Sequence, residues 1–276
     1  PVVIEKEKVI EKQVVQTVEV VVTAIPPSSV GALQRVKDRG VLFVGFNFEP
    51  PYDYITPDGK FTGLDIEYTR LCAERIGIKE IKGVQTPWDG LIPGLLAEHY
   101  NVISAGMARR PARMEVVDFS DAVYFFGPHL MVLKGNPKDL HSWEDIAAKK
   151  VNVASVMGST DLATCTDTYK LGDLCHGYQE YPQMVADLKA GRLDAIVQAE
   201  LTQRAYLAST GDADVELVKD WVYPETSRVG IAFRKEDTDL RDAFNSCIAE
   251  IKKDGSLAKI LVEFGLSADN IIEGVE

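Results

Sequence analysis

The chain alternates short apolar strands with amphipathic helical segments, and this pattern limits the fold more than any other feature. A helical pattern over 30–39 precedes a continuously apolar strand at 41–46. A helix is expected at 64–76, a strand at 78–84, a helix at 88–97 and a strand at 102–103. This β-α-β-α-β order predicts an α/β fold with a parallel sheet covered by helices.

The alternation restarts further along the chain, which predicts a second α/β lobe. Expected there are a strand at 130–133, a helix at 142–148 capped by Ser142, a strand at 151–156, a helix at 182–190 and a strand at 195–197. A strand at 229–233 and helices at 240–252 and 256–264 follow. We therefore expect lobe 1 to comprise 29–128 plus 222–276, and lobe 2 to comprise 129–221, with a cleft between them. Ligands of such folds collect in that cleft.

Residues 1–28 differ from the rest of the chain. Val, Glu and Lys alternate loosely there, and the stretch ends at Pro26-Pro27. A charged tether is the favoured interpretation, and a helix or strand that pairs with a copy of itself is the alternative. Because the chain starts at Pro1 rather than Met, we expect an upstream segment to have been removed or trimmed.

The charge balance excludes some partners. The 276 residues carry a formal net charge of −12, and a surface of that sign repels phosphate backbones, so nucleic acid is not expected as a partner. No run of 18 apolar residues is present, so nothing in the sequence should span a membrane. Membrane contact is expected only through an N-terminal anchor.

Four cysteines bear on the compartment. Cys165 and Cys175 bracket a polar segment, and we expect a disulfide there because chains usually avoid exposed free thiols; two unrelated thiols are the alternative. That bond would indicate an oxidising, extracytoplasmic compartment. Cys72 and Cys247 lie in apolar helical patterns, where buried free thiols are expected, although pairing stays open. The histidines are scattered, so neither a metal site nor a cofactor is expected.

The segment from Ser104 to Ser120 carries the strongest chemical signal. It begins at a strand end, passes through small residues including Gly106 and Ala108, and then presents Arg113. Backbone N–H groups and a guanidinium fork together suit a carboxylate. The alternative is a surface loop with a solvated arginine.

Three further clusters stand at strand ends or helix starts. Glu49 and Tyr52 follow the first strand, and Trp88 begins a helix, where a core role weighs as much as a pocket role. Ser159 and Thr160 open another helix and could bind an anion, although many helices begin this way. Together these residues predict a pocket for a small zwitterion whose positive end has diffuse charge.

Four stretches also carry a family resemblance: PPYDYITPDGKFTGLDIEYTRLCAERIG, WDGLIPGLLAEHYNVISAGM, PARMEVVDFS and AGRLDAIV. In order and spacing the chain resembles periplasmic solute-binding proteins of ABC importers that take up polar amino acids and related compounds. The resemblance implies a two-lobed type II periplasmic-binding-protein-like fold that closes on its ligand. It also implies a monomer without enzymatic activity, a periplasmic or extracellular location, and an ABC permease as partner.

Within that family the chain most resembles ectoine- and hydroxyectoine-binding proteins. The resemblance implies that Glu49 meets the ring nitrogens, that Tyr52 and Trp88 belong to an aromatic cage, and that Arg113 binds the carboxylate. Ala108 stands where the family has a third cage aromatic. This departure predicts either a roomier pocket or a different ligand.

A second departure concerns the amine. Amino-acid binders of the family usually carry an aspartate shortly after the DAIV strand, and Ala199 stands there between Gln198 and Glu200. If Ala199 faces the pocket, alternation along a strand should turn its neighbours away, although Gln198 remains a candidate ligand residue. An unpaired ammonium in a closed cleft is unfavourable by several kcal/mol. The sequence therefore favours a ligand without a free primary amine.

Other functions stay open at this point. They are a polar α-amino acid binder of the same family, a sensor domain that docks to a receptor kinase, and an enzyme resembling cyclohexadienyl dehydratase. Glu49 would be the general acid of that enzyme, and no nucleophile–base pair is evident.

Overall fold

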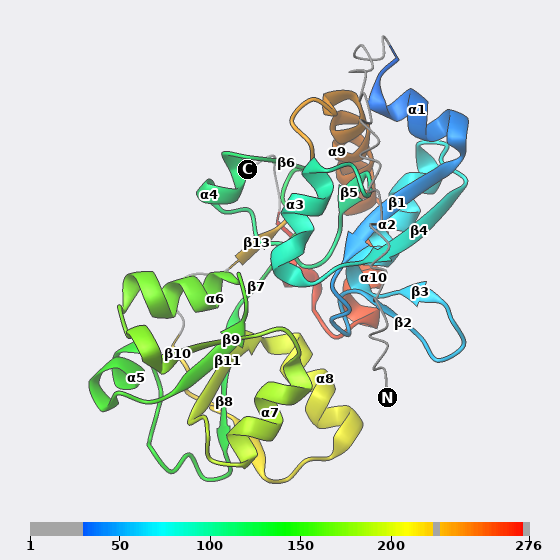
Figure 1. Ribbon diagram of the computed structural model, residues 1–276. Helices are drawn as coiled ribbons and strands as arrows, with labels where there is room; N and C mark the ends of the chain where they lie inside the picture. The colour runs from blue at the N-terminus through cyan, green and yellow to red at the C-terminus, as the bar shows by residue number, and fades with distance from the viewer. Residues whose placement is uncertain (1–29, 223–226, 273–276) are drawn as a thin grey trace, which may run out of the picture. The chain divides into compact units, whose positions relative to one another are not determined.

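Two five-stranded sheets organise the chain in the computed structural model, which describes residues 30–222 and 227–272 (Figure 1). The first sheet has the strand order β4-β1-β5-β14-β6 and the second has the order β10-β9-β11-β8-β12. We call the parts that carry them lobe 1 and lobe 2. The tether expected at 1–28 lies outside the described residues.

Lobe 1 has a mixed sheet. Strands β1 (Val41–Phe46), β4 (Glu80–Gln85) and β5 (Val102–Ile103) are parallel, as the sequence predicts. Strand β14 (Ala232–Phe233) is antiparallel to both β5 and β6 (Asp118–Phe119), so the sheet as a whole is mixed. The reason is that β14 belongs to the chain returning from lobe 2, which enters the sheet from the opposite end.

Helices pack against both faces of this sheet. One apolar cluster joins the sheet to α1 (Ala32–Arg39), α2 (Leu64–Arg75), α9 (Thr238–Lys253) and α10 (Ser256–Glu263). A second cluster joins it to α3 (Leu91–Leu96). The alternation in β1 explains the two faces, since Leu42 and Val44 belong to the first cluster and Phe43 packs against the second.

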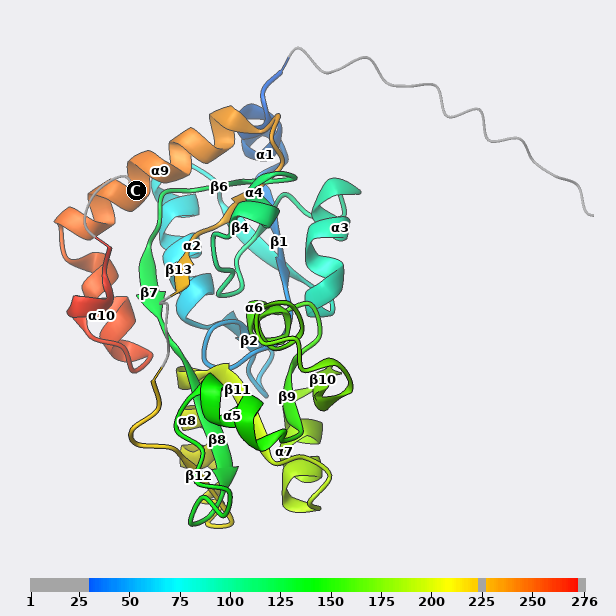
Figure 2. The same cartoon turned by 90° about the vertical axis from the view of Figure 1, so that its left-hand side faces the viewer.

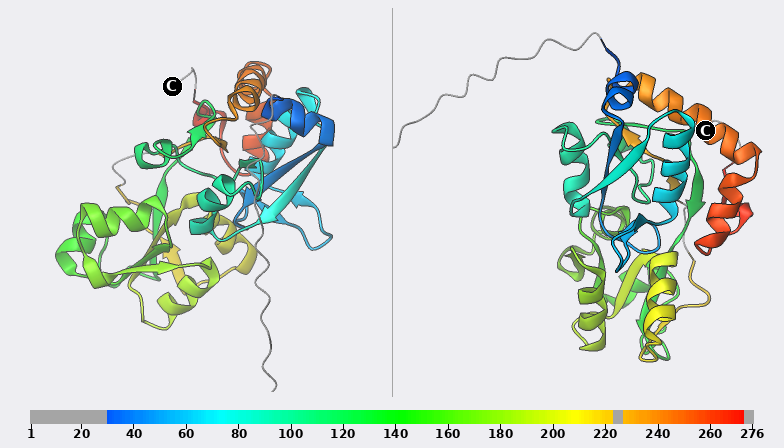
Figure 3. Two further views of the ribbon diagram at one scale, coloured as in Figure 1. Left: turned by 45° about the horizontal axis from the view of Figure 1, so that its top comes forward. Right: turned by 90° about the vertical axis from the view of Figure 1, so that its right-hand side faces the viewer.

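Lobe 2 repeats this arrangement. Strands β9 (Val153–Val156), β10 (Cys175–Tyr178) and β11 (Ala195–Ala199) are parallel, while β8 (Pro128–Leu133) is antiparallel to β11 and β12 (Val215–Leu217). The helices are α5 (Trp143–Lys149), α6 (Thr160–Ala163), α7 (Tyr181–Lys189) and α8 (Glu200–Thr210), seen from two further directions in Figure 3. Ser142 caps α5 as predicted, because its hydroxyl accepts the Asp145 N–H at 3.1 Å.

Two chain crossings connect the lobes. Strand β7 (Tyr124–Phe126) pairs antiparallel with β13 (Ser227–Val229), and β7 runs directly into β8 (Figure 2). The lobe bounds expected from the sequence stay a prediction. We call this two-stranded connection the crossing ribbon.

The remaining elements are short. They are β2 (Tyr54–Ile55), β3 (Phe61–Thr62), α4 (Pro111–Met114), 3-10 turns at Trp88–Gly90, Gly172–Leu174 and Ala268–Asn270, and a π turn at Thr164–Thr168. Within residues 30–222 and 227–272, every helix is too short or too polar to serve as a membrane span.

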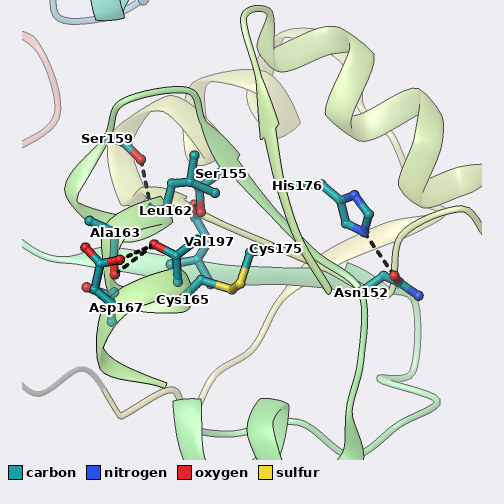
Figure 4. The surroundings of a disulfide bond; sticks show 12 residues. Asn152, Ser155, Ser159, Leu162, Ala163, Cys165, Asp167, Cys175, His176 and Val197 are labelled. Carbon is teal, nitrogen blue, oxygen red and sulfur yellow. Dashed lines mark hydrogen bonds between the residues drawn. A yellow bond between two sulfur atoms is a disulfide. The ribbon is translucent and has the colours of Figure 1, made fainter. Parts of the chain in front are cut away.

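Both pairs of cysteines form disulfides. Cys165 and Cys175, the pair expected from the sequence, are joined, with their Cα atoms 5.9 Å apart (Figure 4). Cys72 and Cys247 are also joined, so the expectation of free buried thiols is wrong. The second bond links α2 to α9 across 175 residues of sequence. The pattern of either helix alone cannot reveal that the two helices pack together.

Candidate ligand-binding site

A pocket between the lobes brings together every residue that the sequence marks for ligand binding. The cavity between its lining residues has a volume of about 40 Å³, so little unfilled space remains in this arrangement of the lobes. The predicted residues that line it are Glu49, Tyr52, Trp88, Gly106, Ala108, Arg113, Ser159, Thr160 and Gln198. It is also lined by Ala105, Phe126, Val156, Asp161, Ala199 and Ser227.

The Arg113 side chain is held in place without a carboxylate partner in the described part of the chain. Its Nη1 donates to the Ala108 carbonyl at 3.0 Å and its Nη2 to the Gly158 carbonyl at 3.5 Å. Its guanidinium carbon lies 5.3 Å from the centre of the Trp88 ring. Desolvation, and next the charge of Arg110, lower the pKa of Arg113 to about 10, while the charge of the pocket-lining Asp161 carboxylate opposes this shift. The site therefore holds a poorly solvated cation that an incoming carboxylate would stabilise.

Trp88 both packs against apolar core residues and lines the pocket, which are the two positions that the sequence left open for it. Its ring packs at the edge of apolar clusters in both lobes, and it also lines the pocket. The indole N–H donates to the Gly158 carbonyl at 3.2 Å. Trp88 thus joins the lobes while orienting Arg113.

Glu49 is positioned by a tight turn after β1. One oxygen of Asp53 accepts the backbone N–H groups of Asn47, Phe48 and Glu49 at 2.9–3.2 Å. This turn places the Glu49 carboxylate against lobe 2, where it accepts hydrogen bonds from Gln198 at 2.9 Å and Thr202 at 2.7 Å. Burial raises the pKa of Glu49, and the hydrogen bond from Thr202 partly opposes that rise.

The geometry of Gln198 corrects the alternation argument. Gln198 and Ala199 both line the pocket, although the sequence analysis expected one to face away when the other faces in. Strand β11 ends at Ala199, where φ is −47° and ψ is 129°, and the chain turns there into α8. Strict alternation therefore does not apply at this position, and the long amide of Gln198 reaches Glu49.

The region around Tyr52 is rich in hydrogen-bond acceptors. Tyr52 is buried, and its hydroxyl has no hydrogen-bond partner among the described residues. Burial, followed by the charges of Glu49 and Asp65, raises the pKa of Tyr52 well above its usual range. Burial likewise raises the pKa of Asp65 to about 7, although Tyr68, Tyr124 and the Gly106 N–H donate to it. A cationic ligand group would be favoured here.

Ser159 and Thr160 enter the pocket from the start of α6. The Ser159 hydroxyl accepts the Leu162 N–H at 3.1 Å and so caps the helix. A capping hydroxyl keeps its own proton for a second acceptor. Ser159 can therefore still donate to a ligand carboxylate near Arg113.

Further bonds hold the lobes together around the pocket. Gln179 of lobe 2 donates to Asp89 of lobe 1 at 3.2 Å. Gly158 has a φ of +74°, and a Cβ added there would lie 3.2 Å from the Cβ of Asp89. A close approach of the two lobes thus depends on glycine at this position. In the described ranges, no group of three or more His, Cys, Asp or Glu residues is placed to hold a metal ion.

Sequence reasoning missed Phe126 and Ser227. Both belong to the crossing ribbon, where they are paired in register, and both line the pocket. Neither lies in a motif, and only the folded topology brings the crossing strands to the site. The sequence could have pointed to these two residues only if residues in the expected chain crossings had been counted as candidates for ligand binding.

Comparisons with known proteins agree with this geometry. The family model for bacterial extracellular solute-binding proteins, family 3, matches residues 42–267. A probable amino-acid ABC transporter periplasmic-binding protein, y4tE of Sinorhizobium fredii, is 32% identical over 87% of this chain and 81% of its own length.

Two solved structures extend the comparison. EhuB in complex with hydroxyectoine has a TM-score of 0.82 at 27% identity, covering 86% of this chain and 93% of its own. AncCDT-1, an ancestral amino acid-binding protein and precursor of cyclohexadienyl dehydratase, has a TM-score of 0.74 at 28% identity, covering 84% and 98%.

The fold and the interlobe pocket thus define a two-lobed solute-binding protein, which confirms the expected fold class. The chain belongs to the bacterial extracellular solute-binding proteins of family 3.

Proposed function

We propose that the protein captures a small zwitterion, with a carboxylate at one end and a diffuse cation at the other, outside the cytoplasm, and delivers it to an ABC permease. The observation that carries this proposal is the pairing of opposite charges in one pocket. Arg113 is a half-buried cation with no carboxylate at ion-pair distance among the described residues, and Glu49 is a half-buried anion whose side-chain hydrogen bonds within those residues come from neutral donors.

The ligand carboxylate would bind at Arg113. The guanidinium offers a fork of N–H donors, and the Ser159 hydroxyl lies on the lobe 2 side of the same pocket. Because Arg113 contacts carbonyls of both lobes, a bound carboxylate would also favour the closed arrangement.

The cationic end would lie near Glu49 and Tyr52. The Phe126 ring lies 5.6 Å from that of Tyr52, so the crossing ribbon supplies an aromatic surface in a pocket where Ala108 offers none. Aromatic faces favour cations with delocalised charge. The likeness to EhuB, solved with hydroxyectoine, supports an ectoine-like ligand in which the charge is spread over an amidinium.

The alternatives receive less support from the site. A plain α-amino acid is favoured by the relative y4tE, but Ala199 offers no carboxylate to its ammonium. For catalysis, Glu49 would need an organised proton-transfer partner, and it is engaged by the amides of Asn47 and Gln198 and by the Thr202 hydroxyl. We therefore propose binding rather than turnover.

The compartment and the assembly follow from the same proposal. Two disulfides suit an oxidising, extracytoplasmic compartment. We further propose that the protein acts as a monomer and is anchored at the membrane through its N-terminal segment. Gel filtration and membrane fractionation of the full chain test these two statements.

A thermal-shift panel tests the proposed ligand class. Ectoine, hydroxyectoine, betaines and α-amino acids would be added to the purified protein. A true ligand at 100 times its dissociation constant stabilises the fold by about 2.7 kcal/mol. We expect ectoine-like compounds to raise the melting temperature more than α-amino acids do. Absence of a shift with every zwitterion contradicts the proposal, and turnover of prephenate or arogenate would favour the enzyme instead.

A further inference from the structure

A second cavity adjoins the ligand pocket. The two share Glu49, Val156 and Gln198 in their linings. The second cavity has a volume of about 450 Å³. We call this cavity the side groove. It receives residues of both lobes, so closure brings its walls together as it does those of the pocket.

The side groove is built to accept an apolar group. Thr202, Ala205 and Ser209 line it from one face of α8, and their small side chains leave room along the helix. The rings of Tyr181 and Tyr206 line it as well, with centres 5.7 Å apart. Their hydroxyls are used elsewhere, by the Met131 sulfur and by Asp212, which leaves carbon surface for the groove.

Lobe 1 contributes an exposed aromatic side chain to the same groove. Phe48 lines it and is 44% exposed. Its φ is +65°, an unfavourable value for a residue with a Cβ, and the Asp53 carboxylate holds this turn by accepting the Phe48 N–H at 2.9 Å. The fold thus maintains a costly backbone conformation that leaves an aromatic ring uncovered beside the pocket.

The junction between the two cavities is the Glu49 carboxylate. It contacts Gln198, which lines both cavities, and Thr202, which lines the side groove. A ligand nitrogen bound at Glu49 would therefore stand at the opening into the groove. A substituent carried by that nitrogen would extend into the groove and away from Arg113.

We propose that the site accepts amino acids substituted on nitrogen, with the carboxylate at Arg113, the cationic nitrogen at Glu49 and an uncharged apolar substituent in the side groove. This inference rests on the proposed function, since it uses the same carboxylate anchor. It agrees with Ala199, because a nitrogen bound at Glu49 needs no carboxylate at position 199. The groove lining includes Glu49 and Glu180 and no basic residue, which disfavours an anionic substituent.

Calorimetry with a matched pair of ligands tests the inference. N-methylglycine and N-benzylglycine share the carboxylate and the secondary ammonium, and they differ only in the substituent. We expect N-benzylglycine to bind at least tenfold more tightly to the wild-type protein. Ala205→Trp should fill the groove and abolish this difference while leaving the affinity for N-methylglycine unchanged. Phe48→Ala, which removes a wall instead of filling the space, should reduce the difference severalfold.

Ala208→Trp is the matched control, because Ala208 lies on the same helix and does not line the groove. It should preserve the tenfold difference. Equal affinities for the two compounds in the wild-type protein, or a difference that survives Ala205→Trp, overturn the inference. Ectoine measured alongside distinguishes failure of the groove inference from failure of the proposed function. If ectoine binds and N-benzylglycine binds no more tightly than N-methylglycine, only the role of the side groove is rejected. If none of these carboxylate compounds binds, the proposed function is rejected.

Discussion

At the scale of single residues, Arg113 decides whether a carboxylate can bind. Arg113→Ala should weaken the binding of carboxylate ligands by about 2–5 kcal/mol, because one partner of the charge pair formed in the complex is removed. The lower value corresponds to a roughly thirtyfold higher dissociation constant. Arg113→Lys should recover only part of this loss, because an ammonium lacks the fork and the ring contact with Trp88. Calorimetry provides the measurement. The control is Arg192→Ala, which removes an exposed arginine paired with Asp187. Unchanged affinity in Arg113→Ala would show that the anchor lies elsewhere.

The raised pKa of Asp65 should make the free energy of unfolding depend on pH. Burial raises its pKa from 3.8 to about 7, so between these values the folded state holds a proton that the unfolded state releases. The free energy of unfolding should therefore fall as pH rises from about 4 to 7, by at most about 1.4 kcal/mol per unit for this group. Raised pKa values of Glu49 and Asp53 act in the same direction.

Urea unfolding at several pH values measures this slope, and Asp65→Asn should flatten it. Asp58→Asn is the control, because Asp58 is exposed and its pKa is lowered, so its effect lies at lower pH. Stability that stays constant or rises between pH 4 and 7 would contradict the assignment of Asp65.

At the scale of elements, the two disulfides should contribute unequally. The bond between Cys72 and Cys247 spans 175 residues and that between Cys165 and Cys175 spans 10. In the chain-entropy account, the longer loop gives about 5 kcal/mol and the shorter about 3 kcal/mol. Replacing each pair with alanine and measuring denaturant unfolding tests the order. A larger loss from removal of the short loop would contradict it.

The crossing ribbon makes a separate prediction. Phe126→Ala should weaken a ligand with a delocalised cation by about 0.5–2 kcal/mol, because an aromatic wall is lost. Phe125→Ala is the matched control on the same strand, since Phe125 does not line the pocket. Calorimetry with ectoine compares the two variants. Equal affinities in Phe126→Ala and wild type would remove Phe126 from the site.

Local pattern and long-range topology explain what the sequence could predict. Strand β1 and the Ser142 cap follow from apolar runs and capping chemistry within a few residues, and both were predicted. Arg113 and Glu49 were singled out because strand ends are recognisable locally, and both line the pocket, although their role in binding stays a prediction. The disulfide between Cys72 and Cys247 and the contribution of Phe126 depend on segments distant in the chain meeting in space. A pattern within a few residues of sequence cannot predict such long-range contacts.

At the scale of the whole molecule, the two lobes meet around a pocket lined by both a cationic and an anionic side chain. Bonds from Trp88 to Gly158, from Gln179 to Asp89, and from Gln198 and Thr202 to Glu49 join lobe 1 to lobe 2. Three of these four bonds involve residues that line the pocket, so ligand contact and closure use the same side chains. We therefore expect ligand binding to stabilise this arrangement of the lobes.

Mass spectrometry of the protein, purified without refolding, tests the central claim most directly. The compound released on denaturation should contain a carboxylate and a cationic nitrogen, and it should be absent from Arg113→Ala purified in parallel. A released compound without a carboxylate, or one that Arg113→Ala retains equally, would contradict the carboxylate anchor and with it the proposed function.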